Sequence, residues 1–174
     1  MAVNIRGLVI CMKHAAAAML PKRSGSIVNI ASQAGTRGGL AGYAYAASKG
    51  AVLAVTRSAA VELGASGIRA NAISPGAIVT GFFGKTAGVE GAKADKVTGV
   101  VREIFQGLQP LNRAGESVDV ANAAAFLASD WGSFVNGHDL LVDGGSTINL
   151  MHWDEGWALR KQLRDAIEAA AALI

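Results

Sequence analysis

The sequence predicts an α/β protein whose parallel sheet carries helices on both faces. Short runs of branched apolar residues alternate with helical stretches of ten or more residues, and connections of that length join parallel strands. Hydrophobic residues make up 51% of the chain, which suits a sheet buried on both faces. With 174 residues, the chain is long enough for one domain with its own core.

The first elements can be placed from their apolar patterns. Residues 4–20 are apolar around most of the helical circumference, which is typical of a helix buried on two sides, and Pro21 ends it. Branched residues at 26–31 predict a short strand. A helix over 43–63 follows a glycine-rich loop and ends at Gly64.

The second half alternates in the same way but contains a less regular stretch. The expected elements are, in chain order, strand 68–74, helix 94–107, helix 117–130, strand 138–142 and helix 154–172. Residues 77–113 are rich in glycine and weakly periodic, which is typical of a flap. Three strands make a small sheet, so we expect the last helix to cover part of its open surface.

Composition excludes several classes of protein. The net charge is +3 and the basic residues are scattered, which argues against a nucleic-acid surface. Cys11 is the single cysteine, and the three histidines show no ligand spacing, so we expect no internal disulfide and no metal site. Lys13 and His14 interrupt the apolar N-terminal stretch, so we expect neither a signal peptide nor a membrane span, and a cytoplasmic location.

The stretch "SQAGTRGGLAGYAYAASK", residues 32–49, has two chemical interpretations. Its glycines could form a phosphate-binding loop between a strand and a helix. That loop needs a G-x-G pair for its tight turn and for close approach of the backbone to a pyrophosphate. None of the 22 glycines is in such a pair, so these glycines are better explained as bends in a loop.

The second interpretation is a proton-transfer site. Tyr45 and Lys49 are four residues apart and therefore share one face of a helix. An ammonium about 4 Å from the phenolate oxygen would favour the ionised form by about 4 kcal/mol at an effective dielectric of about 20. Ser32, at the end of the preceding strand, could donate a hydrogen bond to the same substrate oxygen. The alternative is a surface pair of no chemical role. Tyr43 has Ala47 on its own face and is expected to pack.

Four motifs in the same order resemble the short-chain dehydrogenase/reductase family. They are "IVNIASQAG", "YAASKGAV", "IRANAISPGAIVT" and "FLASDWGSFVNGHDLLVDGG". "VNIRG" is similar to the family segment that carries an active-site asparagine, and the resemblance covers about residues 3–147. It implies a partial doubly wound, Rossmann-like sheet whose N-terminal strands are absent.

The resemblance also implies roles for individual residues. Tyr45 would exchange a proton with the substrate oxygen, and Lys49 would support its ionised form and hold the nicotinamide ribose. Ser32 would polarise the carbonyl, and Asn4 would anchor a water in a proton relay behind Lys49. Asn4 could instead be a helix-start cap.

Two further groups of residues would complete the site. Pro75, Gly76, Ile78 and Thr80 would lie beside the nicotinamide carboxamide, although a turn at the end of a strand also explains the first two. Gln33, Phe82 and Phe83 would contact the substrate, and the phenylalanines could instead belong to the core.

The implied function is an NAD- or NADP-dependent oxidoreductase that interconverts a secondary alcohol and a carbonyl compound. Residues 1–150 would be its catalytic domain, and residues 151–174 a C-terminal helix packed on it. The glycine-rich nucleotide-binding half of the family is absent, so about 80–100 residues are expected ahead of Met1, and cofactor binding by this chain alone is in question. The alternatives are a structural subunit and a cofactor-independent Tyr/Lys acid–base enzyme. The helices at 4–20 and 43–63 predict a homodimer or homotetramer.

Overall fold

The computed structural model describes residues 2–148 and 153–173, and the chain forms two compact units. We call Met1–Pro75 with Val120–Val142 the sheet unit, and Gly76–Asp119 with Asp143–Ile174 the flap unit. This division follows contacts within the chain, and the domain boundary at residue 150 stays a prediction.

The sheet unit contains three parallel strands in the order β1-β2-β3. They are β1 (Gly25–Ile30), β2 (Ile68–Pro75) and β3 (Asp139–Val142). Their positions confirm the predicted strands to within one residue at each end. The central strand β2 is buried along most of its length, because it has a neighbour on each side and helices above and below.

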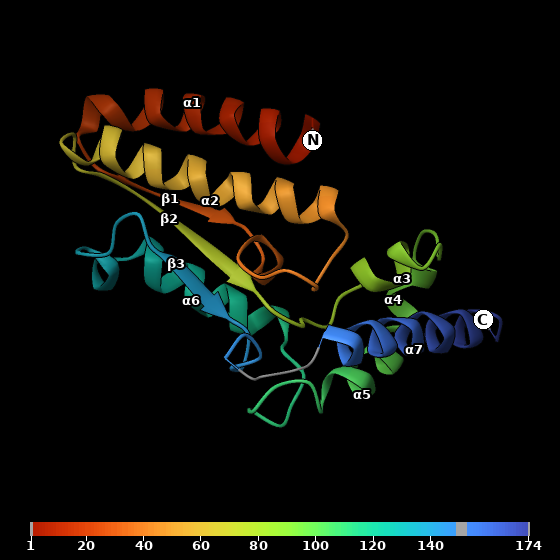
Figure 1. Cartoon of the computed structure of the whole chain (residues 1–174). Coiled ribbons are helices and arrows are strands. Elements are labelled where there is room, and N and C mark those ends of the chain that lie inside the picture. The colour runs from red at the N-terminus through yellow and green to blue at the C-terminus, as the bar shows by residue number, and fades with distance from the viewer. Residues whose placement is uncertain (1, 149–152, 174) are drawn as a thin grey trace. The chain divides into compact units, whose positions relative to one another are not determined.

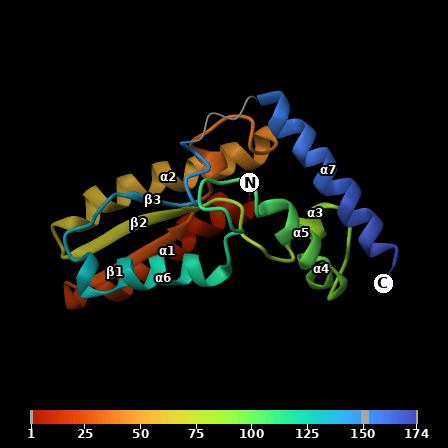
Figure 2. The same ribbon diagram turned by 90° about the horizontal axis from the view of Figure 1, so that it is seen from below.

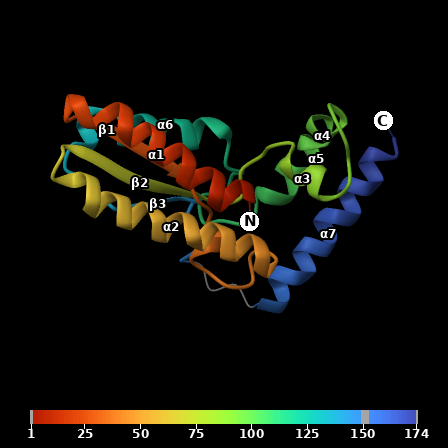
Figure 3. The ribbon, with the colours of Figure 1, turned by 90° about the horizontal axis from the view of Figure 1, so that it is seen from above.

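Helices cover both faces of this sheet, as predicted. Figure 1 shows α1 (Leu8–Met19) and α2 (Tyr43–Gly64) side by side over one face, and α6 (Ser117–Ala128) lies against the other. Views from below and above show the same two layers (Figures 2 and 3). The doubly wound arrangement of the described strands and helices is therefore confirmed.

The N-terminal helix differs from the prediction in two ways. Residues Ala2–Gly7 form a π-helical segment, η1, and a short 3₁₀ turn, η2 (Leu20–Lys22), follows α1. The prediction that this helix is buried on two sides is wrong within this chain, because Met12 is the one buried residue of α1. Its apolar outer side has no covering element among the described residues of the sheet unit.

The uncovered surface of this helix also bears on the membrane prediction. Among the described residues, the helical stretch Ala2–Lys22 is long and apolar enough to span a bilayer, with a mean hydropathy of 1.3 and 6% of its window buried. Lys13 and His14 do not lower its hydropathy enough to exclude it, contrary to our expectation. Length and composition alone are weak support for a span, since core helices and signal sequences near an N-terminus meet the same criteria.

Gly67 shows why the chain can turn sharply between α2 and β2. Its φ is +73°, a conformation that residues with a Cβ rarely adopt. A Cβ at this position would lie 2.3 Å from the backbone oxygen of Arg23. Glycine therefore allows the turn and its close approach to the chain just before β1.

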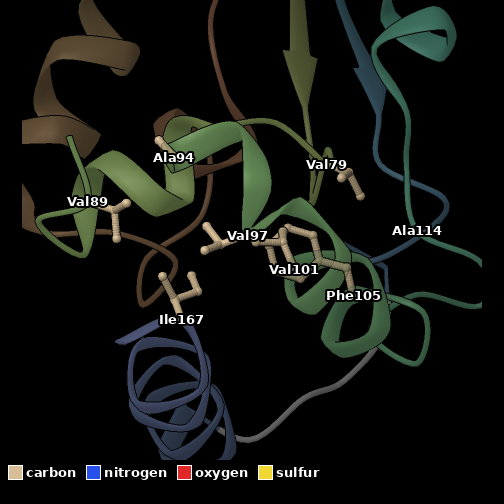
Figure 4. Packing of buried hydrophobic residues seen from close by; sticks show 8 residues of the cluster. All are labelled: Val79, Val89, Ala94, Val97, Val101, Phe105, Ala114 and Ile167. Carbon is tan, nitrogen blue, oxygen red and sulfur yellow. The ribbon is translucent and has the colours of Figure 1, made fainter. Parts of the chain in front are cut away.

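The flap unit is built from short helices around one apolar cluster. It contains α3 (Phe82–Thr86), α4 (Lys93–Lys96), α5 (Thr98–Phe105) and α7 (Trp153–Ala171). The helix predicted over 94–107 is thus two helices, and α3 was not predicted. Figure 4 shows the eight buried residues of the cluster, which are Val79, Val89, Ala94, Val97, Val101, Phe105, Ala114 and Ile167.

Helix α7 follows the predicted range closely. Its buried residue Ile167 lies in the apolar cluster of the flap unit, together with the partly buried Leu163, Ala170 and Ala171. These four residues are spaced by four, three and one positions and therefore share one face of the helix. This apolar face packs in the same cluster as Val97 and Val101. That α7 covers part of the sheet stays a prediction.

Candidate active site

Ser32 stands where β1 ends. The strand finishes at Ile30, and Ser32 caps the 3₁₀ turn η3 (Gln33–Gly35) with its side-chain oxygen. Its Oγ accepts a hydrogen bond from the backbone N–H of Ala34 at 3.2 Å. Because this bond uses only a lone pair of the hydroxyl, the Ser32 proton is available for donation to a substrate oxygen.

Tyr45 and Lys49 occupy successive turns at the start of α2. The Lys49 Nζ lies 5.8 Å from the centroid of the Tyr45 ring and donates a hydrogen bond to the backbone oxygen of Ile30 at 2.9 Å. Partial burial lowers the pKa of the Lys49 ammonium from its ordinary value. The hydrogen bond to Ile30 fixes Lys49 at the carboxyl end of β1, two residues before Ser32.

Gly35 explains how the Ser32 turn is held against α2. A Cβ on Gly35 would lie 2.8 Å from the carbonyl carbon of Lys49 and 2.9 Å from the nitrogen of Gly50. The turn therefore packs directly on the backbone of α2 at Lys49. We interpreted the glycines of this stretch only as bends. That holds for Gly39, with its φ of +82°, but Gly35 serves close packing.

Asn4 contacts α2 at Ser48, and its predicted role in anchoring a water behind Lys49 stays a prediction. Its Nδ2 donates to the Ser48 Oγ at 3.1 Å, and Ser48 donates to the backbone oxygen of Tyr45 at 2.8 Å. Asn4 lies inside η1, and α1 has no side-chain cap. The structure thus contradicts the interpretation of Asn4 as a helix-start cap. Ser48 was missed in the sequence, although it is the serine of "YAASK".

The four residues predicted beside the nicotinamide fall in both units. Pro75 ends β2, whereas Gly76, Ile78 and Thr80 belong to the flap unit. Ile78 is buried and forms an isolated parallel bridge with Gly115. The Thr80 Oγ1 accepts a hydrogen bond from the backbone N–H of Phe82 at 3.4 Å. Ile78 and Thr80 therefore have structural contacts, and their role toward a cofactor stays a prediction.

The predicted substrate residues differ in exposure. Gln33 is half-buried in the turn after Ser32. Phe83 packs edge-on against Phe105 of the flap core, with ring centroids 4.7 Å apart. Phe82 stacks edge-on against Phe83 at 5.3 Å and is 47% exposed. Phe83 is thus largely a packing residue, and Phe82 presents the more accessible ring.

One depression in the described part of the chain lies apart from the predicted catalytic residues. A depression of about 700 Å³ in the flap unit is lined by residues 87–90, Lys93, Glu168 and residues 171–172, and includes none of the predicted catalytic residues. No group of three or more His, Cys, Asp or Glu side chains among the described residues could hold a metal ion.

Two carboxylates with altered pKa values also belong to the flap unit. Hydrogen bonds from Arg113 and the Glu116 backbone lower the pKa of Asp119 to about 2. Burial raises the pKa of Asp143, but hydrogen bonds, the first from Thr147, outweigh it and lower the pKa overall. Each carboxylate accepts backbone N–H groups near a turn, so both are explained by local structure.

Comparisons with known proteins agree with this class of fold. The family model described as enoyl-(acyl carrier protein) reductase matches residues 1–147. The secoisolariciresinol dehydrogenase of Forsythia intermedia is 44% identical over 149 residues, which are 84% of this chain and 51% of that protein. A short-chain dehydrogenase reductase of Arabidopsis thaliana is 44% identical over 151 residues, 83% of this chain and 55% of that protein.

Solved structures show the same similarity. A levodione reductase structure matches with a TM-score of 0.70 and 37% identity, covering 83% of this chain and 55% of that one. A structure described as ElxO with NADP bound matches with a TM-score of 0.69 and 32% identity, covering 84% and 56%. The chain belongs to the short-chain dehydrogenase/reductase family. It spans about half the length of the curated relatives it matches.

Proposed function

We propose that this chain carries the catalytic half of an NAD(P)-dependent oxidoreductase that interconverts a secondary alcohol and a carbonyl compound. The observation that supports this best is the position of Lys49. Its ammonium is fixed to the end of β1 beside the Ser32 turn and lies next to the Tyr45 ring. The relatives are named as dehydrogenases, and a similar structure is described with NADP bound.

The residues on the nicotinamide side fit a cofactor. The Lys49 ammonium has three N–H groups, and the described residues show one of them bonded to Ile30, which leaves two for ribose hydroxyls. The pyrophosphate side does not fit, because this sequence has no G-x-G loop. When bound, a nicotinamide cofactor would supply the hydride for carbonyl reduction and would accept it in alcohol oxidation. NAD and NADP are equally compatible with the residues present.

The chain's own residues perform the proton chemistry. In the direction of reduction, the Ser32 hydroxyl donates a hydrogen bond to the carbonyl oxygen and increases the positive charge on its carbon. As negative charge develops on that oxygen, Tyr45 transfers its phenolic proton to it. Lys49 stabilises the resulting phenolate by its charge. In oxidation the same groups act in reverse, and Tyr45 takes the alcohol proton.

The variant Tyr45→Phe tests this mechanism. It removes one oxygen with little change of volume, so the free energy of unfolding should change by less than about 1.5 kcal/mol. Turnover of a secondary alcohol with NAD or NADP should fall to background. Retention of more than a tenth of the wild-type rate would overturn the role of Tyr45.

Calorimetric titration with NADH and NADPH separates this function from its alternatives. Binding in the micromolar range supports an oxidoreductase. No binding of either nucleotide at millimolar concentration would exclude redox activity of this chain by itself and would favour a structural subunit or a cofactor-independent acid–base enzyme. Those two are distinguished by whether Tyr45→Phe affects any measurable reaction of the chain.

We also propose that the chain is a cytoplasmic protein, without a membrane or nucleic-acid partner, that forms a homodimer or homotetramer through α1 and α2. The support is the apolar outer side of these helices, where Val9, Ile10 and Val61 are exposed, together with the exposed Val3 of η1. Light scattering coupled to size-exclusion chromatography tests the assembly. A single folded species of 17.7 kDa at micromolar concentration would overturn it.

A further inference from the structure

Helix α7 lies beyond the residues that the family model matches. The match ends at residue 147, and α7 begins at Trp153. The resemblance to the family therefore implies no role for α7, and the proposed mechanism uses none of its residues. Its purpose has to be inferred from its contacts within the flap unit.

The contact of α7 with the flap core is small and apolar. Among the described side chains of α7, Ile167 is the one that is fully buried, and it shares a cluster with Val101 and Phe105 of α5. Figure 4 shows Ile167 projecting from α7 toward this cluster. Lys161 and Asp165 form an ion pair that is exposed, and such pairs add little to stability. The attachment of α7 therefore depends mainly on the apolar contact around Ile167.

Phe105 connects this contact to α3. Its ring is 4% exposed and meets the ring of Phe83 edge-on, with centroids 4.7 Å apart and an interplanar angle of 86°. Phe83 meets the ring of Phe82 edge-on in turn, at 5.3 Å. This geometry is favoured because the positive edge of one ring faces the negative face of the other. Packed side chains thus join Ile167 to Phe82.

A second contact holds α3 against α4. A Cβ on Gly84 would lie 2.9 Å from the Cα and from the backbone oxygen of Ala94, so the two helices pack backbone against backbone. Ala94 is fully buried in the same cluster as Ile167. Helix α3 has only five residues, and a helix of this length is not stable on its own. Its order therefore depends on its contacts with α4 and α5.

We propose that α7 is a strap, whose docking through Ile167 holds α4 and α5 in place and so keeps α3 ordered. Release of α7 then opens α3 as well, and the flap unit has a docked and an open state. This purpose of α7 goes beyond the proposed function. Phe82 and Phe83 of α3 are predicted substrate contacts, so the strap would also act on substrate binding, and that consequence alone rests on the proposed function.

Amide hydrogen exchange in α3 tests the coupling without any turnover. The backbone N–H groups of Lys85 and Ala87 donate to the backbone oxygens of Gly81 and Phe83, so their exchange reports the opening of α3. In Ile167→Ala these two amides should exchange at least tenfold faster than in the wild type. In Ile167→Val, which loses one carbon atom, they should respond in the same direction but less, and this variant serves if Ile167→Ala does not fold.

Two further variants are the controls. Leu173→Ala truncates a side chain that follows α7 and is 89% exposed, and it should leave α3 exchange within twofold of the wild type. Ile68→Ala removes the same three carbon atoms as Ile167→Ala, but from β2 in the sheet unit, where Ile68 is 0% exposed. It should lower the unfolding midpoint and leave α3 exchange within twofold. Unchanged α3 exchange in both Ile167 variants would overturn the inference, as would equal acceleration in Ile68→Ala.

Steady-state kinetics tests the consequence for the substrate. In Ile167→Ala, KM for a secondary alcohol should rise at least fivefold while kcat stays within twofold, because only the docked fraction of the protein presents an ordered α3. Faster α3 exchange with an unchanged KM would support the strap and remove Phe82 as a substrate contact. Unchanged α3 exchange would overturn the strap whatever the value of KM. An inactive wild type would count against the proposed function and would leave the exchange result as the test of the strap.

Discussion

Replacing Ile167 by alanine tests whether α7 is an integral part of the flap unit. Ile167 is 1% exposed and is the one α7 residue in the fully buried cluster of Val97, Val101 and Phe105 among the described side chains. The substitution removes three carbon atoms. Their transfer from water contributes about 0.8 kcal/mol each, or about 2.4 kcal/mol together. A cavity that does not collapse adds to this cost.

We therefore expect Ile167→Ala to lower the free energy of unfolding by about 3–4 kcal/mol, within the range for truncation of buried isoleucine. Urea unfolding followed by circular dichroism measures this loss. With a slope of about 2 kcal/mol per molar urea, the midpoint should fall by about 1.5–2 M. Hydrogen exchange should also show faster opening of α5, whose Val101 and Phe105 lie in the same cluster.

Leu173→Ala is the matched control, because Leu173 follows α7 and is 89% exposed. Its removal should change stability by less than about 0.5 kcal/mol. If Ile167→Ala shifts the midpoint no more than Leu173→Ala does, the packing of α7 on the flap core is refuted. The same result would leave α7 as an appendage of the described structure.

Two other substitutions test the site turn and the acid stability of the flap unit. Gly35→Ala should lower the free energy of unfolding by about 1–3 kcal/mol and reduce activity, because the added Cβ meets the Lys49 backbone. Gly38→Ala is the control, since no atom lies within 4 Å of its added Cβ, and it should change stability little. Equal unfolding midpoints for the two variants would contradict the close packing. The pKa of Asp119 is about 2 when folded, below the ordinary value of about 3.9, so its pairing with Arg113 stabilises the protein above about pH 4 and this contribution is lost as the pH falls toward 2. After solvent screening this contribution to the free energy of unfolding is below about 1 kcal/mol. In urea titrations, stability should therefore fall less steeply between pH 4 and pH 2 in Asp119→Asn than in the wild type. The same dependence of stability on pH in both proteins would count against the pairing.

Elements that are marked by a pattern within a few neighbouring residues could be predicted from the sequence. The three strands and the helix at 43–63 were predicted because branched runs and apolar periodicity are read within a few residues. The placement of Lys49 beside the Ser32 turn follows from a strand, a turn and a helix in succession.

What the sequence did not show depends on contacts between distant residues. The role of Gly35 depends on how closely its turn approaches α2, and the contact of Ser48 is with Asn4, which is 44 positions earlier. The packing of α7 in the flap cluster could not be predicted, because an apolar stripe shows that a helix face is covered but not by which element. Similarly, apolar periodicity gave no sign that Ala2–Gly7 is π-helical.

The π-helical segment Ala2–Gly7 has a consequence for how the gene for this protein can vary. A π turn holds one residue more than an α turn, so loss of a single codon between Asn4 and Gly7 would convert the segment to regular α-helix. Every residue before the deletion would then rotate by about 100° around the helix axis. Asn4 would turn away from Ser48, although its codon is intact. We therefore expect point substitutions at the exposed positions of this segment to preserve the contact of Asn4 with Ser48, and in-frame deletions to break it.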